Sequence, residues 1–220
     1  METKKIYAVL TGDLIGSSRF RVEEREKVIS NLKDSFKMIS PDSITSPFVI
    51  FRGDSFQGVL SRPNEALNAA LIIRSSLLSR FKGKKARLDA RIAIGIGTID
   101  YLPGDQVGEG DGEAYRNSGP ELDKMKKREQ NIIIKTPWAG INEELRIECS
   151  LLDALIQRWT KEQAEVILYH ITKGVTQEEI AKILGISQPA VFQRLKTGGY
   201  WAVQAFIEHF EVIIHEKAGN

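Results

Sequence analysis

The sequence predicts an α+β fold, in which an N-terminal sandwich of sheet and helices is followed by an all-α segment. Up to residue 135, short runs rich in β-branched residues alternate with amphipathic helical stretches. After residue 140, apolar residues recur only at helical spacing. The stretch 136–140 contains Pro137 and Gly140 and is the best linker candidate. We therefore expect two domains, residues 1–140 and residues 141–220.

The first domain begins with a continuous apolar run at 5–14, which is typical of a strand buried on both faces. A long amphipathic helix is expected at 21–39, and the two prolines of 41–47 predict a break. Residues 48–60 predict a hairpin. Its tip, Arg52-Gly53-Asp54, matches an adhesion tripeptide, but a tight turn explains it better.

The remaining elements complete the sandwich. A helix is expected at 63–81, with an inner stripe of Ala66, Ala69, Ala70, Ile73 and Leu77. A central strand at 88–99, a helix at 114–128 and a short buried strand at 131–135 follow. The order strand, helix, hairpin, helix, strand predicts a sandwich of the ferredoxin-like kind.

Helices are expected in the second domain at 145–159, 160–172 and 200–215, with a pair of short helices between the last two. Thr176 and Glu179 form a capping box, Gly185 can end the first helix of the pair, and Ser187 can cap the second. Such a pair is a helix-turn-helix, the DNA-binding geometry. The residues expected to contact DNA are Ser187, Gln188, Gln193, Arg194 and Lys196. An ordinary helical hairpin with a solvated outer face is the alternative.

Composition limits these interpretations. The 220 residues are 42% hydrophobic and carry a net charge of +2, and no apolar run is long enough to span a membrane, so we expect a soluble cytoplasmic protein. The lone Cys149 is expected to be a small buried hydrophobe in a reducing compartment. Residues 150–220 contain 7 Lys and Arg against 8 Asp and Glu. A single copy of the helix pair should therefore bind DNA weakly.

Three stretches of the first domain are similar to class III nucleotide cyclases: AVLTGDLIG at 8–16, FRGDSF at 51–56 and RIAIGIG at 91–97. The resemblance implies that Asp13 and Asp54 hold Mg²⁺ on a triphosphate, and that Gly16, Ser17 and Arg52 contact the nucleotide. It also implies a homodimer, because such domains share their site between two copies. From the residues alone, Asp13 could equally accept backbone hydrogen bonds and Asp54 could cap the hairpin turn.

The chain departs from the cyclase pattern at the residues that carry the chemistry. Ile50 stands where cyclases place the lysine that reads the base. Arg116 and Pro120 are nearest to their transition-state Asn and Arg. Without donors aimed at the developing charge, turnover loses several kcal/mol of stabilisation, so we expect nucleotide or metal sensing, or an inherited fold without either role, rather than catalysis.

Nearly the whole chain, from TGDLIG to the C-terminal helices, resembles the bacterial SatD family, and the helix pair resembles region 4 of sigma factors. The leading hypothesis is a DNA-binding, transcription-regulating homodimer with a nucleotide-sensing or dimerising first domain. A metal-dependent enzyme acting on nucleoside triphosphates and a protein-interaction adaptor are the alternatives. The histidines at 170, 209 and 215 have no ligand spacing within one helix, so we assign them no metal role. The adaptor is favoured by the aromatic and apolar residues Tyr200, Trp201, Phe206, Phe210 and Ile214, which are otherwise expected in the core.

Overall fold

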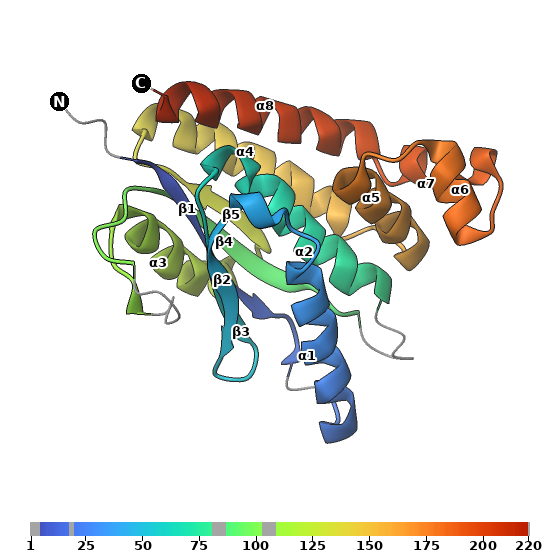
Figure 1. Cartoon of the computed structure of the whole chain (residues 1–220), viewed down its shortest axis with the longest axis horizontal. Coiled ribbons are helices and arrows are strands. Elements are labelled where there is room, and N and C mark those ends of the chain that lie inside the picture. Colours follow the sequence, from blue (N-terminus) through green and yellow to red (C-terminus); the bar gives the residue numbers. More distant parts are fainter. Residues whose placement is uncertain (1–4, 18–19, 81–86, 103–108, 220) are drawn as a thin grey trace.

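The computed structural model describes residues 5–17, 20–80, 87–102 and 109–219 (Figure 1). Its first part has strands β1 (Tyr7–Leu14), β2 (Ile44–Phe51), β3 (Ser55–Leu60), β4 (Ala90–Gly97) and β5 (Ile132–Lys135), with helices α1 (Val22–Phe36), α2 (Ala66–Arg80) and α3 (Glu113–Arg128). Its last part has only helices: α4 (Ala139–Ile156), α5 (Lys161–Lys173), α6 (Gln177–Leu184), α7 (Gln188–Thr197) and α8 (Tyr200–Ala218). Short 3₁₀ turns η2 (Pro41–Ser43) and η3 (Pro63–Glu65) precede β2 and α2. The fold is therefore mixed α/β.

The five strands form one sheet in the order β2-β3-β1-β4-β5. Strand β1 is antiparallel to β3 and β4, β2 is antiparallel to β3, and β5 is parallel to β4. The succession β1-α1-β2-β3-α2-β4 is the β-α-β-β-α-β order that was predicted. Strand β5 extends this four-stranded unit at the edge next to β4.

Alternation along β1 sends its side chains to two different layers. Leu10 and Leu14 belong to the large hydrophobic cluster that includes residues of α1 and α2. Val9 packs with Ala114 of α3 on the opposite face of the sheet. Asp13 is in phase with Val9, so its carboxylate faces the α3 layer. This alternation decides where the predicted site residues can meet.

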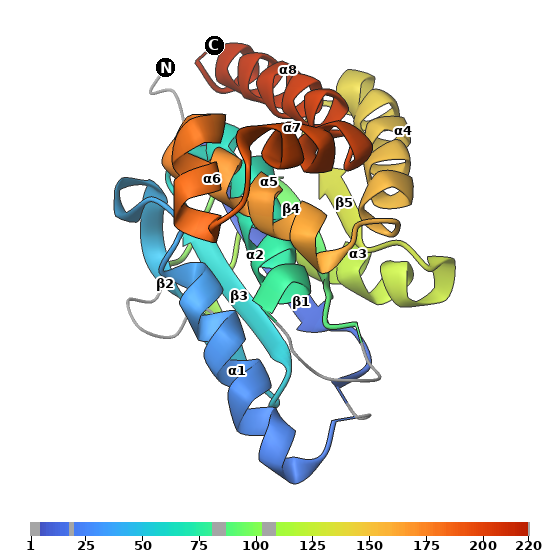
Figure 2. The same ribbon diagram turned by 90° about the vertical axis from the view of Figure 1, so that its right-hand side faces the viewer.

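Helix α2 is buried on nearly all sides, whereas the sequence predicted a single inner stripe. It lies between the sheet and the C-terminal helix α5, as the two views in Figures 1 and 2 show. A helix that is apolar all round is one that other elements cover on every side. The predicted single stripe is therefore wrong, because α5 and α1 also contact α2, and Leu67, Leu71, Ile72 and Leu78 outside the stripe are buried as well.

A buried ionic network connects the two halves of the chain through Arg74 of α2, which is fully buried. Its guanidinium donates to both carboxylate oxygens of Asp89, at 3.0 and 2.9 Å, and to Oδ1 of Asp153 at 2.6 Å. The other oxygen of Asp153 accepts the backbone N–H groups of Asn131 and Ile132. Burial alone lowers the pKa of Arg74, but the two carboxylates outweigh it and raise the pKa above its ordinary value. The network ties α2, α4 and the strands β4 and β5 together.

The change from strands to helices falls at Ala139, close to the predicted boundary at residue 140. Residue 136 is held to the first turn of α4, because the backbone N–H of Thr136 donates to Asn142 Oδ1 at 2.8 Å and Asn142 Nδ2 donates back to the Thr136 carbonyl at 3.0 Å. One hydrophobic cluster runs from Ala8 of β1 to Ile214 of α8. The helices after residue 140 thus share their core with the sheet.

Strand β2 and Cys149 can both be compared with the sequence prediction. The predicted break at 41–47 is partly wrong, since β2 already begins at Ile44 and contains Pro47. Proline is tolerated there because β2 is an edge strand, and its register is irregular around this residue. Cys149 is fully buried, as predicted, and burial raises the pKa of its thiol. No helix in the described part of the chain is long and apolar enough to cross a membrane.

Candidate functional site

The hairpin between β2 and β3 turns through two residues in the left-handed conformation, Arg52 with φ 53° and Gly53 with φ 85°. A right-twisted hairpin favours this kind of turn, and glycine adopts it readily. For Arg52, which has a Cβ atom, the same conformation costs roughly 1–2 kcal/mol. Backbone strain of this kind gathers at binding sites, where the surrounding structure holds it in place. The turn therefore marks the hairpin tip as a candidate site.

The loop that follows β1 is bound to this hairpin tip. Ser17 Oγ donates to Asp54 Oδ2 at 2.6 Å, and the backbone N–H of Leu14 donates to the Asp54 carbonyl at 3.0 Å. Gly16, at φ 69°, makes the turn that brings Ser17 back over the hairpin. Asp54 is thus tied to the end of β1 through its backbone and to the following loop through its side chain.

A cavity of about 200 Å³ lies between this loop, the hairpin tip and α1. Arg25, Arg52, Asp54 and Ser17 are its polar lining residues, and the rest of its wall is formed by Gly53 and the apolar residues Leu14, Phe20, Val28 and Ile29. Two positive charges against one negative charge favour an anionic ligand. Ligand sites commonly enclose about 300–1,000 Å³, so this cavity would hold only part of a nucleotide. Arg25 was not singled out in the sequence, where it is one charge among many at the start of a helix.

Asp13 does not line this cavity. Its carboxylate is 7% exposed and forms ion pairs with Arg91 Nη1 at 3.2 Å and with Lys126 Nζ of α3 at 3.0 Å. Asp54 faces α1 on the other side of the sheet, so the two carboxylates have separate partners on separate layers. A cation on Asp13 would displace two existing cations. The residues present therefore do not fit the Mg²⁺ site that the cyclase resemblance implies, and we derive no chemistry through it.

The other residues at cyclase-like positions also lie away from the cavity. Ile50 is a partly buried side chain of β2 that packs against the main hydrophobic cluster. Arg116 of α3 pairs with Asp100 at 3.1 Å and with Asp111 at 2.8 Å, and these hydrogen bonds and charges raise its pKa. Arg116 therefore stabilises the segments before α3.

The α6–α7 pair has the predicted caps and turn. Thr176 Oγ1 accepts the Glu179 backbone N–H, Glu179 accepts the Thr176 backbone N–H at 2.7 Å, and Gly185 ends α6 at φ 65°. Ser187 Oγ accepts the Ala190 backbone N–H at the start of α7. The prediction of two capped helices is confirmed, whereas their binding role stays a prediction.

The outward stripe of α7 consists of Gln188, Phe192 and Lys196, which are four residues apart and exposed. Gln188 Nε2 donates to Gln177 of α6 at 2.9 Å, which orients its amide. Gln193 is exposed beside the stripe. Phe192 is 42% exposed and was not among the residues predicted to contact DNA.

Of the two remaining residues predicted to bind DNA, Ser187 is exposed and Arg194 is partly buried. Ser187 is exposed at the N-terminus of α7, where its side chain serves as the cap. Arg194 is partly buried on the side that turns toward α5, and its charge contributes to the lowered pKa of Glu162 there, behind the hydrogen bonds to that carboxylate. Arg194 is thus the member of the set least available to an external ligand.

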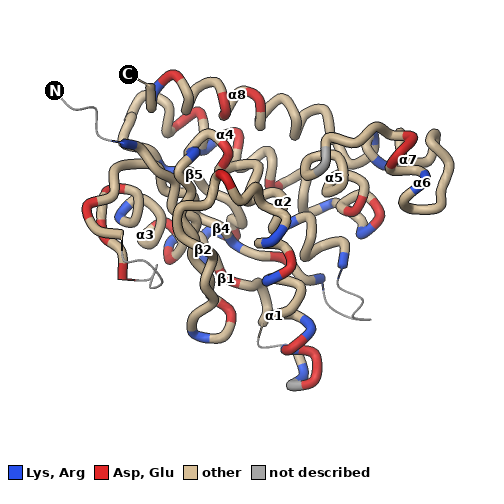
Figure 3. Tube along the Cα trace, viewed as in Figure 1, with Lys and Arg blue, Asp and Glu red and all other residues tan. Residues whose placement is uncertain are grey.

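Charge at this end of the molecule is mixed. Figure 3 shows acidic and basic segments side by side over α5, α6 and α7. Glu178 and Glu179 lie in the first turn of α6, whereas Lys196 lies in the last turn of α7. The structure therefore agrees with the absence of net positive charge that the sequence indicated for residues 150–220.

Comparison with known proteins gives a family and a distant structural likeness. A solved GGEEF domain of a diguanylate cyclase from Vibrio cholerae aligns with 60% of this chain, and the alignment covers 83% of that domain. The sequence identity is 17% and the TM-score is 0.45. No curated protein matches. The model of the SatD family matches residues 7–206. Since this match covers most of the 220 residues, the chain belongs to the SatD family.

Proposed function

We propose that this protein is a transcription-regulating DNA-binding protein that places α7 in the major groove of duplex DNA. The observation that carries the proposal is the exposed stripe of Gln188, Phe192 and Lys196, with Gln193 beside it. Glutamine amides can pair with adenine edges, an exposed phenyl ring can contact a thymine methyl group, and a lysine can contact phosphate.

The position of the helix pair supports this use. In Figure 1, α6 and α7 lie at one end of the molecule, beyond the sheet and next to α5. Val191 and Leu195 of α7 are buried on the inner side, which holds the helix while its outer stripe stays exposed. A second helix that presents one polar face while its neighbour supports it is the arrangement that enters a major groove.

The part of the chain that contains α7 carries no net positive charge, so a single copy should bind DNA weakly and a dimer is part of the proposal. Phosphate contacts supply most of the non-specific affinity of a DNA-binding protein, and this end of the chain offers few cations. Two copies would present two α7 helices to half-sites about 34–36 Å apart. We accordingly propose a homodimer in the DNA-bound state.

The cavity at the hairpin tip is proposed as the site of a small anionic effector, with a nucleotide as the leading candidate. Arg25 and Arg52 would pair with phosphate oxygens, and Ser17, which the turn at Gly16 positions, would contact them from the loop after β1. Binding there would bias the homodimer rather than supply a catalytic step.

Fluorescence anisotropy with the DNA upstream of the protein's own gene tests the DNA-binding proposal. The double variant Gln188→Ala, Lys196→Ala should lose binding, and Lys196→Ala alone should reduce the slope of log affinity against log salt by about one. Lys217→Ala, an exposed lysine near the end of α8, is the matched control. Equal binding by the double variant and the control would refute the proposal.

Calorimetric titration of the protein with each common nucleotide tests the effector proposal separately. Arg52→Ala and Arg25→Ala should each weaken binding, whereas the control Arg62→Ala, an exposed arginine paired with Glu65, should not. Unchanged affinity in both cavity variants would remove the effector site but would leave the DNA proposal intact.

A protein-interaction adaptor remains a second candidate because of one aromatic pair. Phe192 and Trp201 are both exposed, and their rings meet edge to face with centroids 5.6 Å apart. Exposed aromatic pairs are frequent anchors of protein interfaces. The test is the variant Trp201→Ala. If it binds DNA normally but no longer captures a protein partner, the adaptor is favoured.

A further inference from the structure

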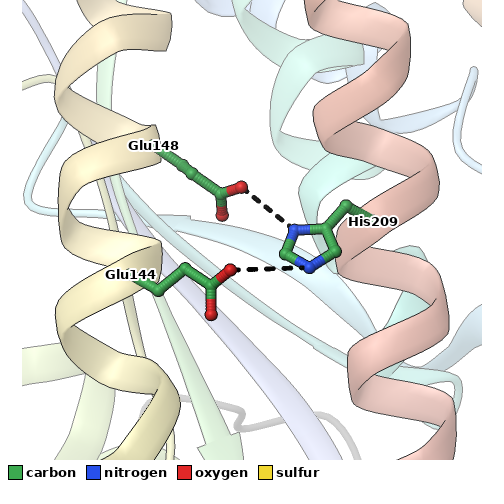
Figure 4. A group of neighbouring side chains, drawn as sticks. All are labelled: Glu144, Glu148 and His209. Carbon is green, nitrogen blue, oxygen red and sulfur yellow. Dashed lines mark hydrogen bonds and ion pairs between the residues drawn. The ribbon is translucent and has the colours of Figure 1, made fainter.

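Three side chains that can bind a metal meet between α4 and α8. Glu144 and Glu148 project from α4, and His209 projects toward them from α8 (Figure 4). His209 Nδ1 lies 3.0 Å from Glu148 Oε1, and His209 Nε2 lies 3.6 Å from Glu144 Oε1. The sequence reasoning gave His209 no metal role because it compared residues within one helix, whereas these ligands come from two helices.

The spacing of the set suits a single ion. Two residues four apart on one helix present their side chains on one face, and a third ligand from a facing helix completes a tripod. One donor atom from each residue lies within 4.8 Å of the others. Ligands of a tetrahedral ion with bonds of about 2.1 Å are separated by roughly 3.4 Å, so rotation of one glutamate side chain toward the ring nitrogen that faces the other would bring the three into range.

Two further observations at this group point to an additional occupant. Glu148 Oε2 is buried and has no hydrogen-bond partner among the described residues. A buried carboxylate oxygen without a partner is costly, and a bound cation would satisfy it. Next to it lies a cavity of about 340 Å³, to which Glu148 and His209 contribute and whose remaining wall is apolar, including Leu151, Leu155 and Phe206. The cavity leaves space for a fourth ligand of the ion.

We propose that Glu144, Glu148 and His209 bind a divalent transition-metal ion, for which Zn²⁺ is the probe. Two carboxylates and a neutral imidazole balance a charge of +2. An imidazole ligand favours Zn²⁺ and its neighbours over Mg²⁺ or Ca²⁺, which prefer oxygen ligands. The ion takes one ring nitrogen, so the carboxylate that faces the other nitrogen must turn toward it. The ion would link α8 to α4. Because α8 follows α7 directly, this link would also hold the proposed DNA-binding helix in place.

The competing explanation is an ion pair without metal, in which a protonated His209 is held between the two carboxylates. The two explanations differ in the response to added metal. Chelator-stripped full-length protein is titrated with Zn²⁺ by calorimetry, with Mg²⁺ as a parallel titration, and its thermal midpoint is recorded with and without Zn²⁺. We expect binding of one Zn²⁺ per chain, a higher midpoint with Zn²⁺ and no response to Mg²⁺.

Variants assign the ligands. His209→Ala and Glu148→Gln should each weaken Zn²⁺ binding by at least about tenfold. The matched controls are His215→Ala, an exposed histidine further along α8, and Glu143→Gln, which neighbours Glu144 but pairs with Arg146. Substitution with Co²⁺ should give visible absorption bands that His209→Ala removes. The proposal is overturned if Zn²⁺ fails to bind the unmodified chain, or if it binds the His209 and Glu148 variants as tightly as the controls.

Discussion

Replacement of Arg74 by methionine should destabilise the whole chain, because it leaves two buried carboxylates without their shared cation. Asp89 and Asp153 are each 5% exposed, and Arg74 makes three hydrogen bonds to them. Removal of one partner from a buried ionic network costs about 3–5 kcal/mol, a large share of the roughly 5–15 kcal/mol that stabilises an ordinary domain. Methionine retains the apolar contacts of the side chain, so the loss is mainly electrostatic.

Guanidinium unfolding followed by circular dichroism and by tryptophan fluorescence measures this loss. The tryptophans at 138, 159 and 201 all report on the C-terminal helices, whereas circular dichroism reports on the whole chain. Because Arg74 joins both halves, the two signals should shift together in Arg74→Met. The triple variant Arg74→Met, Asp89→Asn, Asp153→Asn should recover part of the loss, since it removes the uncompensated charges. A loss below about 1 kcal/mol, or a shift in only one signal, would refute the role assigned to the network.

Three further outcomes follow from the same contacts. Arg52→Asn should raise stability by up to about 1 kcal/mol in urea unfolding, since asparagine tolerates the left-handed conformation, while it weakens anion binding; a loss of stability would contradict the strain assigned to the turn. Ser187→Ala should cost about 1 kcal/mol by the same measurement because α7 loses its cap, and an unchanged midpoint would show that the cap contributes nothing. The backbone N–H and hydroxyl of Thr176 lower the pKa of Glu179 below 4.5, so this carboxylate stabilises α6 above that pH and ceases to as pH falls through its lowered pKa. An acid titration followed by circular dichroism should therefore lose less helix in Glu179→Gln than in the unmodified chain, and equal losses would count against the capping box.

Local features were predictable from the sequence because they depend on neighbouring residues. The capping box at Thr176, the αL glycine at 185 and the cap at Ser187 are satisfied within one helical turn, so their residue types determine the structure. The succession of strands and helices along the first part of the chain also followed, since hydrophobic periodicity distinguishes the two.

Features that depend on distant partners were not predictable. The second covered face of α2 depends on α5, which lies about ninety residues later in the chain. Asp13 was taken for a metal ligand on its motif, but the structure pairs it with Arg91 and Lys126, which no local pattern connects to it. The same reason hid the grouping of Glu144, Glu148 and His209, because no spacing rule joins two helices whose packing is unknown.

The most direct test of the proposed function is selection of duplex DNA from a random pool by the purified full-length chain. We expect enrichment of a motif with two related half-sites about 10 base pairs apart, bound by a homodimer. The base preference within each half-site should change in Gln188→Ala, because that side chain is proposed to contact a base edge. Enrichment of no motif, or of the same motif at the same level by the Gln188→Ala, Lys196→Ala double variant, would contradict the assignment of α7 as the DNA-reading helix.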